Sequence, residues 1–242
     1  MILVTGPTGS GKSTSLYSAL SALNKTEVNI MTVENPVEYN LKGINQVQVN
    51  RDIGFDFPDA LRAFLRQSPN IILVGEIREI DTASIAIRAA LTGHLVLSTL
   101  HTNDAPSASI RLIEMGIAPF LVASSLIGVV AQRLVRRLCE HCKEEYELPE
   151  SVLLDTGLPP GTRAWKPVGC DVCRTTGYRG RTAIFEIMKV DDVIQSLILE
   201  NASATRIRKE AISRGMRTLR QSGLKKVSEG ITSLEEVLQV SL

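Results

Sequence analysis

The chain has 242 residues, 44% of them apolar, and its formal net charge is +1. This apolar content can bury a sizeable core, so we expect one main domain with an appendage. A charge near zero and only 4% aromatic residues exclude a basic nucleic-acid-binding footprint over the whole chain, although a local basic stripe stays open.

The chain opens with a short apolar segment followed by a glycine-rich loop. Ile2–Thr5 is predicted to be a buried strand, and residues 6–13 read GPTGSGKS, a complete G-x-x-x-x-G-K-[ST] pattern. Glycine-rich backbone lets successive N–H groups point at phosphates, and the helix expected after Lys12 adds donors and a positive dipole end. Lys12 would reach the β/γ-phosphates and the Ser13 hydroxyl would bind Mg²⁺. The loop therefore predicts nucleotide binding.

Short β-branched segments alternate with helical patterns through the first half of the chain. Further strands are predicted over residues 28–33, 71–74 and 94–99. Further helices are predicted over residues 59–66 and 81–91, the latter closed by Gly93. This alternation predicts a doubly wound α/β core with parallel strands. Because the chain opens on a strand rather than on a charged leader, no secretory signal is expected. A cytoplasmic location is expected instead.

The second half of the chain has a different pattern. Its longest apolar stretch, residues 117–131, contains a proline and is too short to cross a bilayer, so it is predicted to be a buried helix. Turns and cysteines follow, with a hairpin predicted near residues 182–188. Beyond Asp191 the pattern is helical, and Ser233 with Glu236 predicts a capping box near the end.

Acidic residues that follow two predicted strands are candidates for the metal and water chemistry of hydrolysis. Glu76 lies at the carboxyl end of its strand, where ligands bind in open α/β sheets, so it is assigned to the metal and water shell. Glu34 and Glu38 lie four residues apart on either side of Pro36, and either could orient or deprotonate the attacking water. The spacing leaves open that both are solvated in a surface turn.

Two histidines and two arginines are further candidates. His94 and His101 bracket a predicted strand in a Ser/Thr-rich setting that could hydrogen-bond a γ-phosphate, although a structural histidine is the commoner outcome. Arg62 and Arg66 lie four residues apart on one face of a predicted helix, so they could clamp a phosphate across a subunit boundary. A solvated helix face is the alternative for the arginines.

The four cysteines form two C-x2-C pairs. The pairs are Cys139 with Cys142 and Cys170 with Cys173, separated by 27 residues. This gap is longer than usual, but the proline-containing loop between the pairs can bulge out. Four thiolates suit a closed tetrahedral zinc site with no open coordination position, so zinc would stabilise a subdomain rather than catalyse. Disulfides are not expected in a reducing cytoplasm, and His141 is expected to be a spectator.

Several of these segments together resemble a known family. In chain order they read GPTGSGKST, TVENPVEY, LRQSPNIILVGEIRE and TGHLVLSTLHTNDA, followed by the two CxxC pairs. They resemble the Walker A loop, aspartate box, Walker B segment, histidine box and tetracysteine motif of the secretion and type IV pilus assembly ATPases of the type II secretion superfamily (GspE/PilB-like). The resemblance covers essentially the whole chain. It implies a RecA-like P-loop NTPase core over residues 1–136, a zinc-binding tetracysteine subdomain over 137–186 and a helical C-terminal region over 187–242.

The resemblance also implies roles for individual residues. Nucleotide-binding residues are expected to be Gly6, Pro7, Thr8, Gly9, Ser10, Gly11, Lys12, Ser13, Thr14, Arg62 and Arg66. Catalytic residues are expected to be Lys12, Glu34, Glu38, Glu76, His94 and His101. Glu38 is favoured over Glu34 as the catalytic glutamate of the aspartate box. Ser13 and Glu76 are expected to hold Mg²⁺, Glu76 either directly or through water.

The chain also departs from the family's pattern. Asn35 stands where an aspartate is usual, and Ser68 and Asn70 replace aspartates before the Walker B segment. Asn35 is uncharged, which speaks against a metal or proton role there. Family members carry domains before the P-loop strand that dock onto membrane partners, so the chain resembles the C-terminal motor domain of a longer protein.

The resemblance implies an ATP-hydrolysing cytoplasmic motor that works as a homo-hexameric ring. It would lie at the inner membrane through a membrane platform and cytoplasmic docking proteins, and would power type II secretion or type IV pilus or pseudopilus assembly. Which of these machines it serves, or whether it serves DNA uptake, stays open. No nucleic-acid partner is expected. The alternatives are a nucleic-acid-dependent RecA-like motor, for which Trp165 is the only tryptophan available for base stacking, and a nucleotide-responsive adaptor that does not hydrolyse.

Overall fold

The computed structural model describes residues 1–241 and divides into two compact units. Unit 1 comprises Met1–Ala131 and Ile187–Met216, and unit 2 comprises Gln132–Glu186 and the chain from Arg217 onward. Two long strands, β6 (Gly128–Leu138) and β9 (Tyr178–Lys189), carry the chain from unit 1 into unit 2 and back.

The other elements of unit 1 are β1 (Ile2–Thr5), α1 (Lys12–Leu23), β2 (Ile30–Glu34), β3 (Asn45–Gln48), η1 (Arg51–Ile53), α2 (Phe57–Phe64), β4 (Ile71–Val74), α3 (Ile80–Leu91), β5 (Leu95–Leu100), α4 (Ala105–Glu114), α5 (Pro119–Ser125), α7 (Asp192–Leu199) and α8 (Ala204–Ser213). Those of unit 2 are β7 (Glu144–Glu147), α6 (Glu150–Thr156), β8 (Arg163–Lys166), η2 (Asp171–Cys173), α9 (Leu219–Ser228) and α10 (Leu234–Val240).

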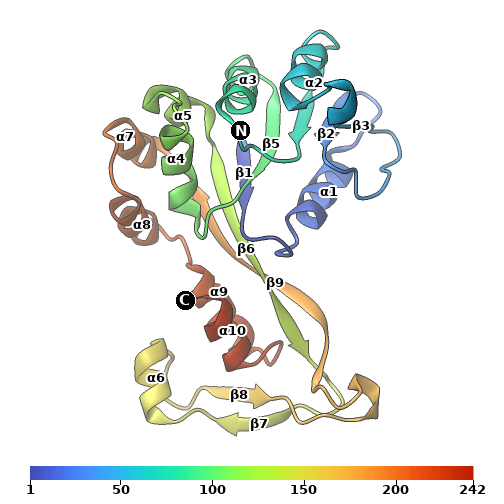
Figure 1. Cartoon of the computed structure of the whole chain (residues 1–242). Helices are drawn as coiled ribbons and strands as arrows, with labels where there is room; N and C mark the ends of the chain where they lie inside the picture. Colours follow the sequence, from blue (N-terminus) through green and yellow to red (C-terminus); the bar gives the residue numbers. More distant parts are fainter. Residues whose placement is uncertain (242) are drawn as a thin grey trace. The chain divides into compact units, whose positions relative to one another are not determined.

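The central sheet has the strand order β3-β2-β4-β5-β1-β6-β9, and all neighbouring pairs from β3 to β6 are parallel (Figure 1). The strands are apolar because helices cover them; all four residues of β4, for example, are buried. The predicted α/β core is confirmed. Because the strands are parallel, their carboxyl ends meet at one edge of the sheet, where ligands bind in such folds.

Helix α1 covers one face of this sheet. Its side chains Leu16, Tyr17 and Leu20 are buried together with sheet residues such as Ile30 and Leu73. Residues three and four apart lie on one helix face, so these three side chains can pack on the sheet together. The Lys12–Thr14 turn lies at the carboxyl edge of the sheet, because β1 ends there and the loop leads directly into α1. The same helix thus carries a core face and the last residues of the phosphate loop.

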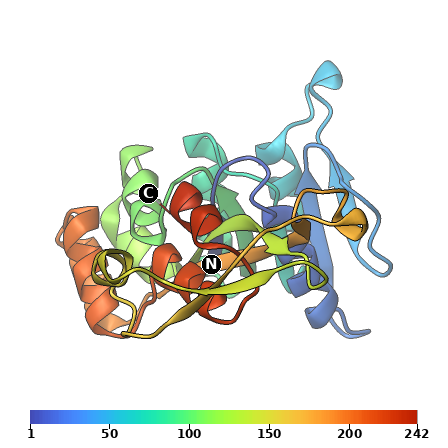
Figure 2. The ribbon, with the colours of Figure 1, turned by 90° about the horizontal axis from the view of Figure 1, so that it is seen from below.

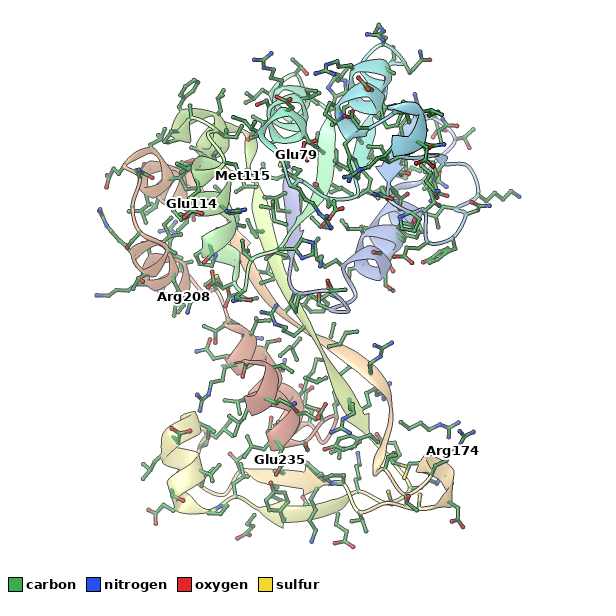
Figure 3. The ribbon with its side chains drawn as sticks, viewed as in Figure 1. Glu79, Glu114, Met115, Arg174, Arg208 and Glu235 are labelled. Atoms are coloured by element: carbon green, nitrogen blue, oxygen red, sulfur yellow. The ribbon has the colours of Figure 1, made fainter. Side chains whose placement is uncertain are left out.

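Helices α7 and α8 come late in the chain but belong to unit 1. They lie beside α4 and α5 in both views (Figures 1 and 2). Arg208 of α8, labelled in Figure 3, forms an ion pair with Asp104, the N-cap of α4. The sequence placed residues 187–216 in the helical C-terminal region, whereas their contacts are with the first half. The three-segment division stays a prediction, because contacts do not show which segments fold independently.

Unit 2 has its own small core. Strands β7 and β8 pair antiparallel, with Tyr146 opposite Ala164. Ala164 is buried with apolar side chains of α9 and α10, including Leu224 and Val237. A Cβ on Gly223 would lie 2.4 Å from a Val237 methyl, so glycine at this position allows α9 and α10 to approach closely.

Two local predictions are corrected by the structure. The hairpin near residues 182–188 is wrong, because this segment lies inside the single long strand β9. The helix over residues 117–131 is wrong in its second half, where β6 begins at Gly128. Apolar runs of this kind suit either a buried helix or a buried strand, and periodicity alone does not separate them.

The predicted capping box is half correct. The Ser233 hydroxyl does accept from the Glu236 N–H and caps α10. The Glu236 carboxylate, however, binds Arg136 at 2.6 Å rather than returning to the Ser233 backbone. Within residues 1–241, no helix is both long and apolar enough to cross a bilayer.

Candidate functional site

The phosphate loop begins at the carboxyl edge of the sheet. Thr5, the last residue of β1, pairs with Leu100, so the loop starts level with His101. Gly9 and Gly11 have φ of 80° and 86°, a left-handed backbone that side chains disfavour. Gly11 is also the N-cap of α1. The predicted strand, loop and helix order is therefore present with the backbone geometry that such a loop requires.

The Lys12 ammonium lies within the loop. It donates to the carbonyls of Gly6 at 2.7 Å and Pro7 at 3.1 Å. Ser13 and Thr14 follow in the first turn of α1, are exposed, and have no acidic residue beside them in that turn. The first N–H groups of a helix have no partner within the helix, and its N-terminus attracts anions. This end of the helix can accept a phosphate group.

Thr5 ties the loop to the end of β5. Its hydroxyl lies 2.9 Å from the Thr102 carbonyl and accepts from the Thr102 N–H at 2.8 Å. This partly buried link holds the residues after β5 next to the start of the loop. Sequence reasoning missed it, since a threonine at a strand end is common and its partner is distant in the chain.

Glu76 and His101 are brought together at the same edge. The His101 Nε2 lies 3.6 Å from a Glu76 carboxylate oxygen, and the Arg78 Nε donates to that oxygen at 2.6 Å. The Glu76 side chain is 17% exposed, whereas Arg78 and His101 are well exposed. Glu76 is thus a partly shielded carboxylate at the end of β4, with β5 between its strand and the P-loop strand.

Gly75 lets this strand end approach its neighbour. A Cβ at Gly75 would lie 3.2 Å from the Glu34 Cα and 3.2 Å from the Val33 carbonyl oxygen. Contacts this close are tighter than most real Cβ contacts, and both partners are backbone atoms. A glycine just before Glu76 therefore lets β2 and β4 end side by side.

The two glutamates of the aspartate box have opposite environments. Glu34 is 4% exposed, and its carboxylate accepts from Tyr17 Oη, from Thr32 Oγ1 at 2.6 Å and from Gln46 Nε2 at 3.2 Å. Glu38 is exposed in the loop after β2. Asn35, which lies between the two glutamates in the chain, is exposed as well. Of the two glutamates, only Glu38 presents its carboxylate to solvent, where the carboxylate could contact a water molecule.

His94 lies at the opposite end of β5 from His101. Seven residues of extended chain separate the two, about 23 Å at the strand rise of ~3.3 Å per residue. The His94 Nδ1 lies 2.9 Å from the Ala89 carbonyl and 3.2 Å from the Thr92 hydroxyl, at the end of α3. Within this chain the structure does not bring His94 to the phosphate loop.

The two arginines do not share a helix face. Arg62 lies on α2 and pairs with Asp59 at 3.2 Å, and both side chains are about half exposed. Helix α2 ends at Phe64, and Arg66 lies in the turn that follows. Both arginines are exposed, but the predicted i, i+4 arrangement is not formed, because the helix ends two residues earlier than the pattern suggested.

The four cysteines form one cluster in unit 2. Their sulfur atoms all lie within 4.8 Å of one another. Cys139 lies 3.9 Å from Cys170, and Cys142 lies 3.8 Å from Cys173. Bonds of ~2.3 Å from a tetrahedral zinc place its sulfur ligands about 3.8 Å apart, whereas a disulfide needs ~2.05 Å. The donor set and its spacing fit zinc.

Backbone N–H groups support the sulfurs. Cys173 Sγ accepts from the Cys170 N–H and from the Gly177 N–H, both at 3.2 Å, and Cys142 Sγ accepts from the Gly169 N–H at 3.3 Å. Burial opposes ionisation of Cys173, but these N–H donors outweigh it and lower the pKa of its thiol to about 6. Desolvation raises the pKa of the Cys142 thiol to about 11. Of these two thiols, Cys173 therefore loses its proton at the lower pH.

Comparison with known proteins decides the family. The model of the family described as "Type II/IV secretion system protein" matches residues 1–239. The chain belongs to this family. Members named as type IV pilus assembly ATPase PilB (Myxococcus xanthus) and type II secretion system protein HxcR (Pseudomonas aeruginosa) are 57% and 52% identical to it. These matches cover 98% and 100% of the chain, but only 43% and 48% of the relatives' own length.

A solved structure supports the fold. The pilus retraction motor PilT with bound ADP superimposes with a TM-score of 0.74 at 31% identity. The superposition covers 99% of this chain and 60% of PilT. The predicted resemblance to secretion and pilus ATPases, and the RecA-like core that it implied, are therefore confirmed.

Proposed function

We propose that this chain is an ATP-hydrolysing motor domain that powers type II protein secretion or the assembly of a type IV pilus or pseudopilus. The main supporting observation is that the phosphate loop, Glu76 and His101 meet at the carboxyl edge of the sheet. The chain that holds this arrangement is 57% identical to a PilB ATPase. The relatives' printed names support the proposal, and the polar groups at this edge are the ones hydrolysis requires.

In this proposal residues 6–14 bind the triphosphate. The loop N–H groups and the N-terminus of α1 hold the phosphate oxygens, and the Lys12 ammonium leaves its carbonyl partners for the β/γ-phosphates. The Ser13 hydroxyl and the Glu76 carboxylate are oxygen donors of the kind that Mg²⁺ prefers. Bound Mg²⁺ would neutralise charge on the phosphates during transfer.

Glu38 is our candidate for the general base, and Glu76 with His101 for the shell around the metal and the γ-phosphate. Glu34 is less suited to the role of base, since three donors already occupy its buried carboxylate. Arg62 and Arg66 are exposed and available to a phosphate held by a neighbouring subunit, as expected for a ring. His94 has a local role at the end of α3 in this chain, and any role in catalysis would be across a subunit boundary.

The cysteine cluster is proposed to hold a structural zinc ion through Cys139, Cys142, Cys170 and Cys173. Four thiolates close the coordination sphere, so zinc would stabilise unit 2 and take no part in hydrolysis. We also propose a homo-hexamer in the cytoplasm, peripheral to the inner membrane through platform and docking proteins. These partners are carried over from the family and are not visible in a single chain.

Turnover of ATP with Mg²⁺ tests this function. Lys12→Ala should abolish both binding of a fluorescent ATP analogue and turnover, because the loop loses its only ammonium. Glu38→Gln should lower kcat by about 100-fold while nucleotide affinity is kept, because a general base contributes ~10²–10⁴ in rate. Matched controls are Lys25→Ala and Glu27→Gln, exposed residues after α1 that should change neither quantity.

The same assay separates the alternatives. Single-stranded DNA should leave turnover unchanged, and strong stimulation by DNA would move the nucleic-acid motor to first place. If the chain binds nucleotide but does not turn it over at any protein concentration, the adaptor reading replaces the motor. Turnover that survives Lys12→Ala would overturn the proposal.

A further inference from the structure

We propose that Tyr17 is a positioning residue for ATP hydrolysis: its hydroxyl, together with the buried Glu34 carboxylate, couples the phosphate-loop helix to the backbone of Glu38. This inference rests on the proposed function, because it needs Glu38 to act in hydrolysis. Sequence reasoning missed Tyr17 altogether. The available signal was a hydroxyl-bearing aromatic side chain on the core face of α1, five residues after Lys12.

Tyr17 occupies the buried side of α1. It is 1% exposed, and its ring packs edge-on against Tyr39 with centroids 4.7 Å apart. Its hydroxyl donates to the Glu34 carboxylate and accepts from the Glu38 N–H at 3.3 Å. One oxygen atom therefore joins a helix residue, a strand-end residue and the proposed base. Burial and the adjacent Glu34 raise the pKa of Tyr17, which keeps the hydroxyl protonated as a donor.

Glu34 has the environment of a structural carboxylate. A buried ionised group is costly unless hydrogen bonds satisfy it. Thr32 and Gln46 supply two of its donors, at 2.6 Å and 3.2 Å, and Tyr17 supplies a third. A carboxylate engaged in this way orients its donors. Its place at the end of β2 makes it the fixed point to which the Tyr17 hydroxyl is held.

Side chains form hydrogen bonds with the backbone of the loop that carries Glu38. Gln48 accepts from the Val37 N–H at 3.1 Å. Gln46 accepts from the Leu41 N–H at 2.6 Å and donates to the Tyr39 carbonyl at 3.2 Å. Both glutamines lie on β3, whereas Tyr17 lies on α1. Tyr17 is therefore the member of this set that connects the loop to the phosphate-binding helix.

The connection is short. Lys12 and Tyr17 are five residues apart on one helix, about 7.5 Å along its axis. A shift of the first turn of α1 on phosphate binding would thus reach the Glu38 backbone through a single side chain. Misplacing a catalytic group by about 1 Å costs up to ~100-fold in rate. We expect the loss of one of several tethers to cost less, about tenfold.

The test is Tyr17→Phe, which keeps the ring in the core and removes the hydroxyl. We expect kcat to fall about tenfold, with KM and affinity for the ATP analogue within about twofold of the original chain. Tyr146→Phe, the same change at a half-buried tyrosine of unit 2, is the matched control and should leave turnover unchanged. Equal kcat for Tyr17→Phe and the original chain would overturn the inference.

A double-mutant cycle distinguishes positioning from loss of packing. If Tyr17 acts through Glu34, then Glu34→Gln should also lower kcat about tenfold, far less than Glu38→Gln, and the double variant should be little worse than either single one. Additive losses, or a fall in kcat that follows a lowered Tm and disappears on cooling, would instead mean that Tyr17 only supports the core.

The original chain is measured first, so that two failures stay distinct. If it shows no turnover, the proposed function fails and this inference fails with it. If the original chain turns over ATP and only Glu38→Gln reduces it, then the function stands and the Tyr17 coupling is wrong.

Discussion

The phosphate-loop edge and the cysteine cluster are both built from short turns, but they leave different groups available. At the phosphate-loop edge Ser13, Thr14 and Glu38 are exposed, and Glu76 is only partly shielded. In the cluster every sulfur lies within 4.8 Å of the other three, and backbone N–H groups support Cys142 and Cys173. An open set of groups can accept substrate, whereas a closed set can only hold an ion and the chain around it. Chemistry and stability are therefore assigned to different units.

The largest expected effect comes from a substitution in the cysteine cluster. Cys173→Ser removes a proposed zinc ligand and the sulfur that accepts from two backbone N–H groups, so zinc should be lost and unit 2 should unfold at lower temperature. For a unit of this size, a loss of ~3 kcal/mol corresponds to a fall in Tm of about 12–24 °C. Bound zinc and Tm would be measured together, and unit 1 should still bind the ATP analogue.

The neighbouring His141 provides the control for that experiment. It lies between Cys139 and Cys142, is exposed, and is expected to be a spectator. His141→Ala should keep one zinc per chain and an unchanged Tm. Loss of zinc in this variant would show that the ligand set is not the four cysteines.

A moderate effect is expected from Gly75→Ala, a substitution at the phosphate-loop edge of the sheet. The added Cβ would meet two backbone atoms at 3.2 Å, so β2 and β4 must move apart next to Glu34 and Glu76. Overpacking of this kind costs about 1–3 kcal/mol, and turnover should fall with Tm. In Gly128→Ala the nearest atom would lie at 3.5 Å, an ordinary contact, so this variant should be close to the original in Tm. Equal Tm for the two variants would contradict the close approach.

The smallest expected effect is a pH dependence in unit 2. Burial opposes ionisation of Glu236, but hydrogen bonds from Arg136 outweigh it and hold its pKa below the ordinary 4.5. The folded state thus binds this proton less readily than the unfolded chain. The stabilisation is complete above pH 4.5 and is lost as the pH falls through the lowered pKa.

We expect this pair to contribute about 1 kcal/mol, because the Arg136 side chain is half exposed and solvent screens it. Glu236→Gln should flatten the fall in unfolding free energy below pH 4.5, measured by urea unfolding across pH. Glu235→Gln, at the exposed neighbour, should leave that fall unchanged. An identical pH profile for Glu236→Gln and the original chain would show that the pair contributes nothing.

Local sequence patterns predicted the parts of the fold that depend on nearest neighbours. The strand, glycine loop and helix at residues 2–23 were found because glycine at Gly9 and Gly11 has a specific backbone purpose. The strands β4 and β5 were found within one residue at either end, since buried parallel strands are continuous apolar runs.

Other elements were missed or misassigned because their partners are distant in the chain. Strand β3 has the polar sequence NQVQ, which resembles a loop, and it forms a strand by pairing with β2. Strand β6 continues an apolar run that also suits a helix, and it is a strand because β1 lies beside it. Propensity is a weak guide where tertiary pairing supplies the hydrogen bonds.

For the candidate site, too, some properties follow from the local sequence and others only from tertiary contacts. The sequence by itself determined which residue types are present: a loop that can hold phosphates, acids after two strands and four cysteines in pairs, because these depend on chemistry and short spacing. Only the tertiary structure decided that Glu34 is buried while Glu38 is exposed, and that Tyr17 joins these two residues to the loop helix. It also decided that His101 lies beside Glu76 while His94 lies at the far end of β5. Burial, strand direction and contacts between distant segments are properties of the folded chain, and no local pattern contains them.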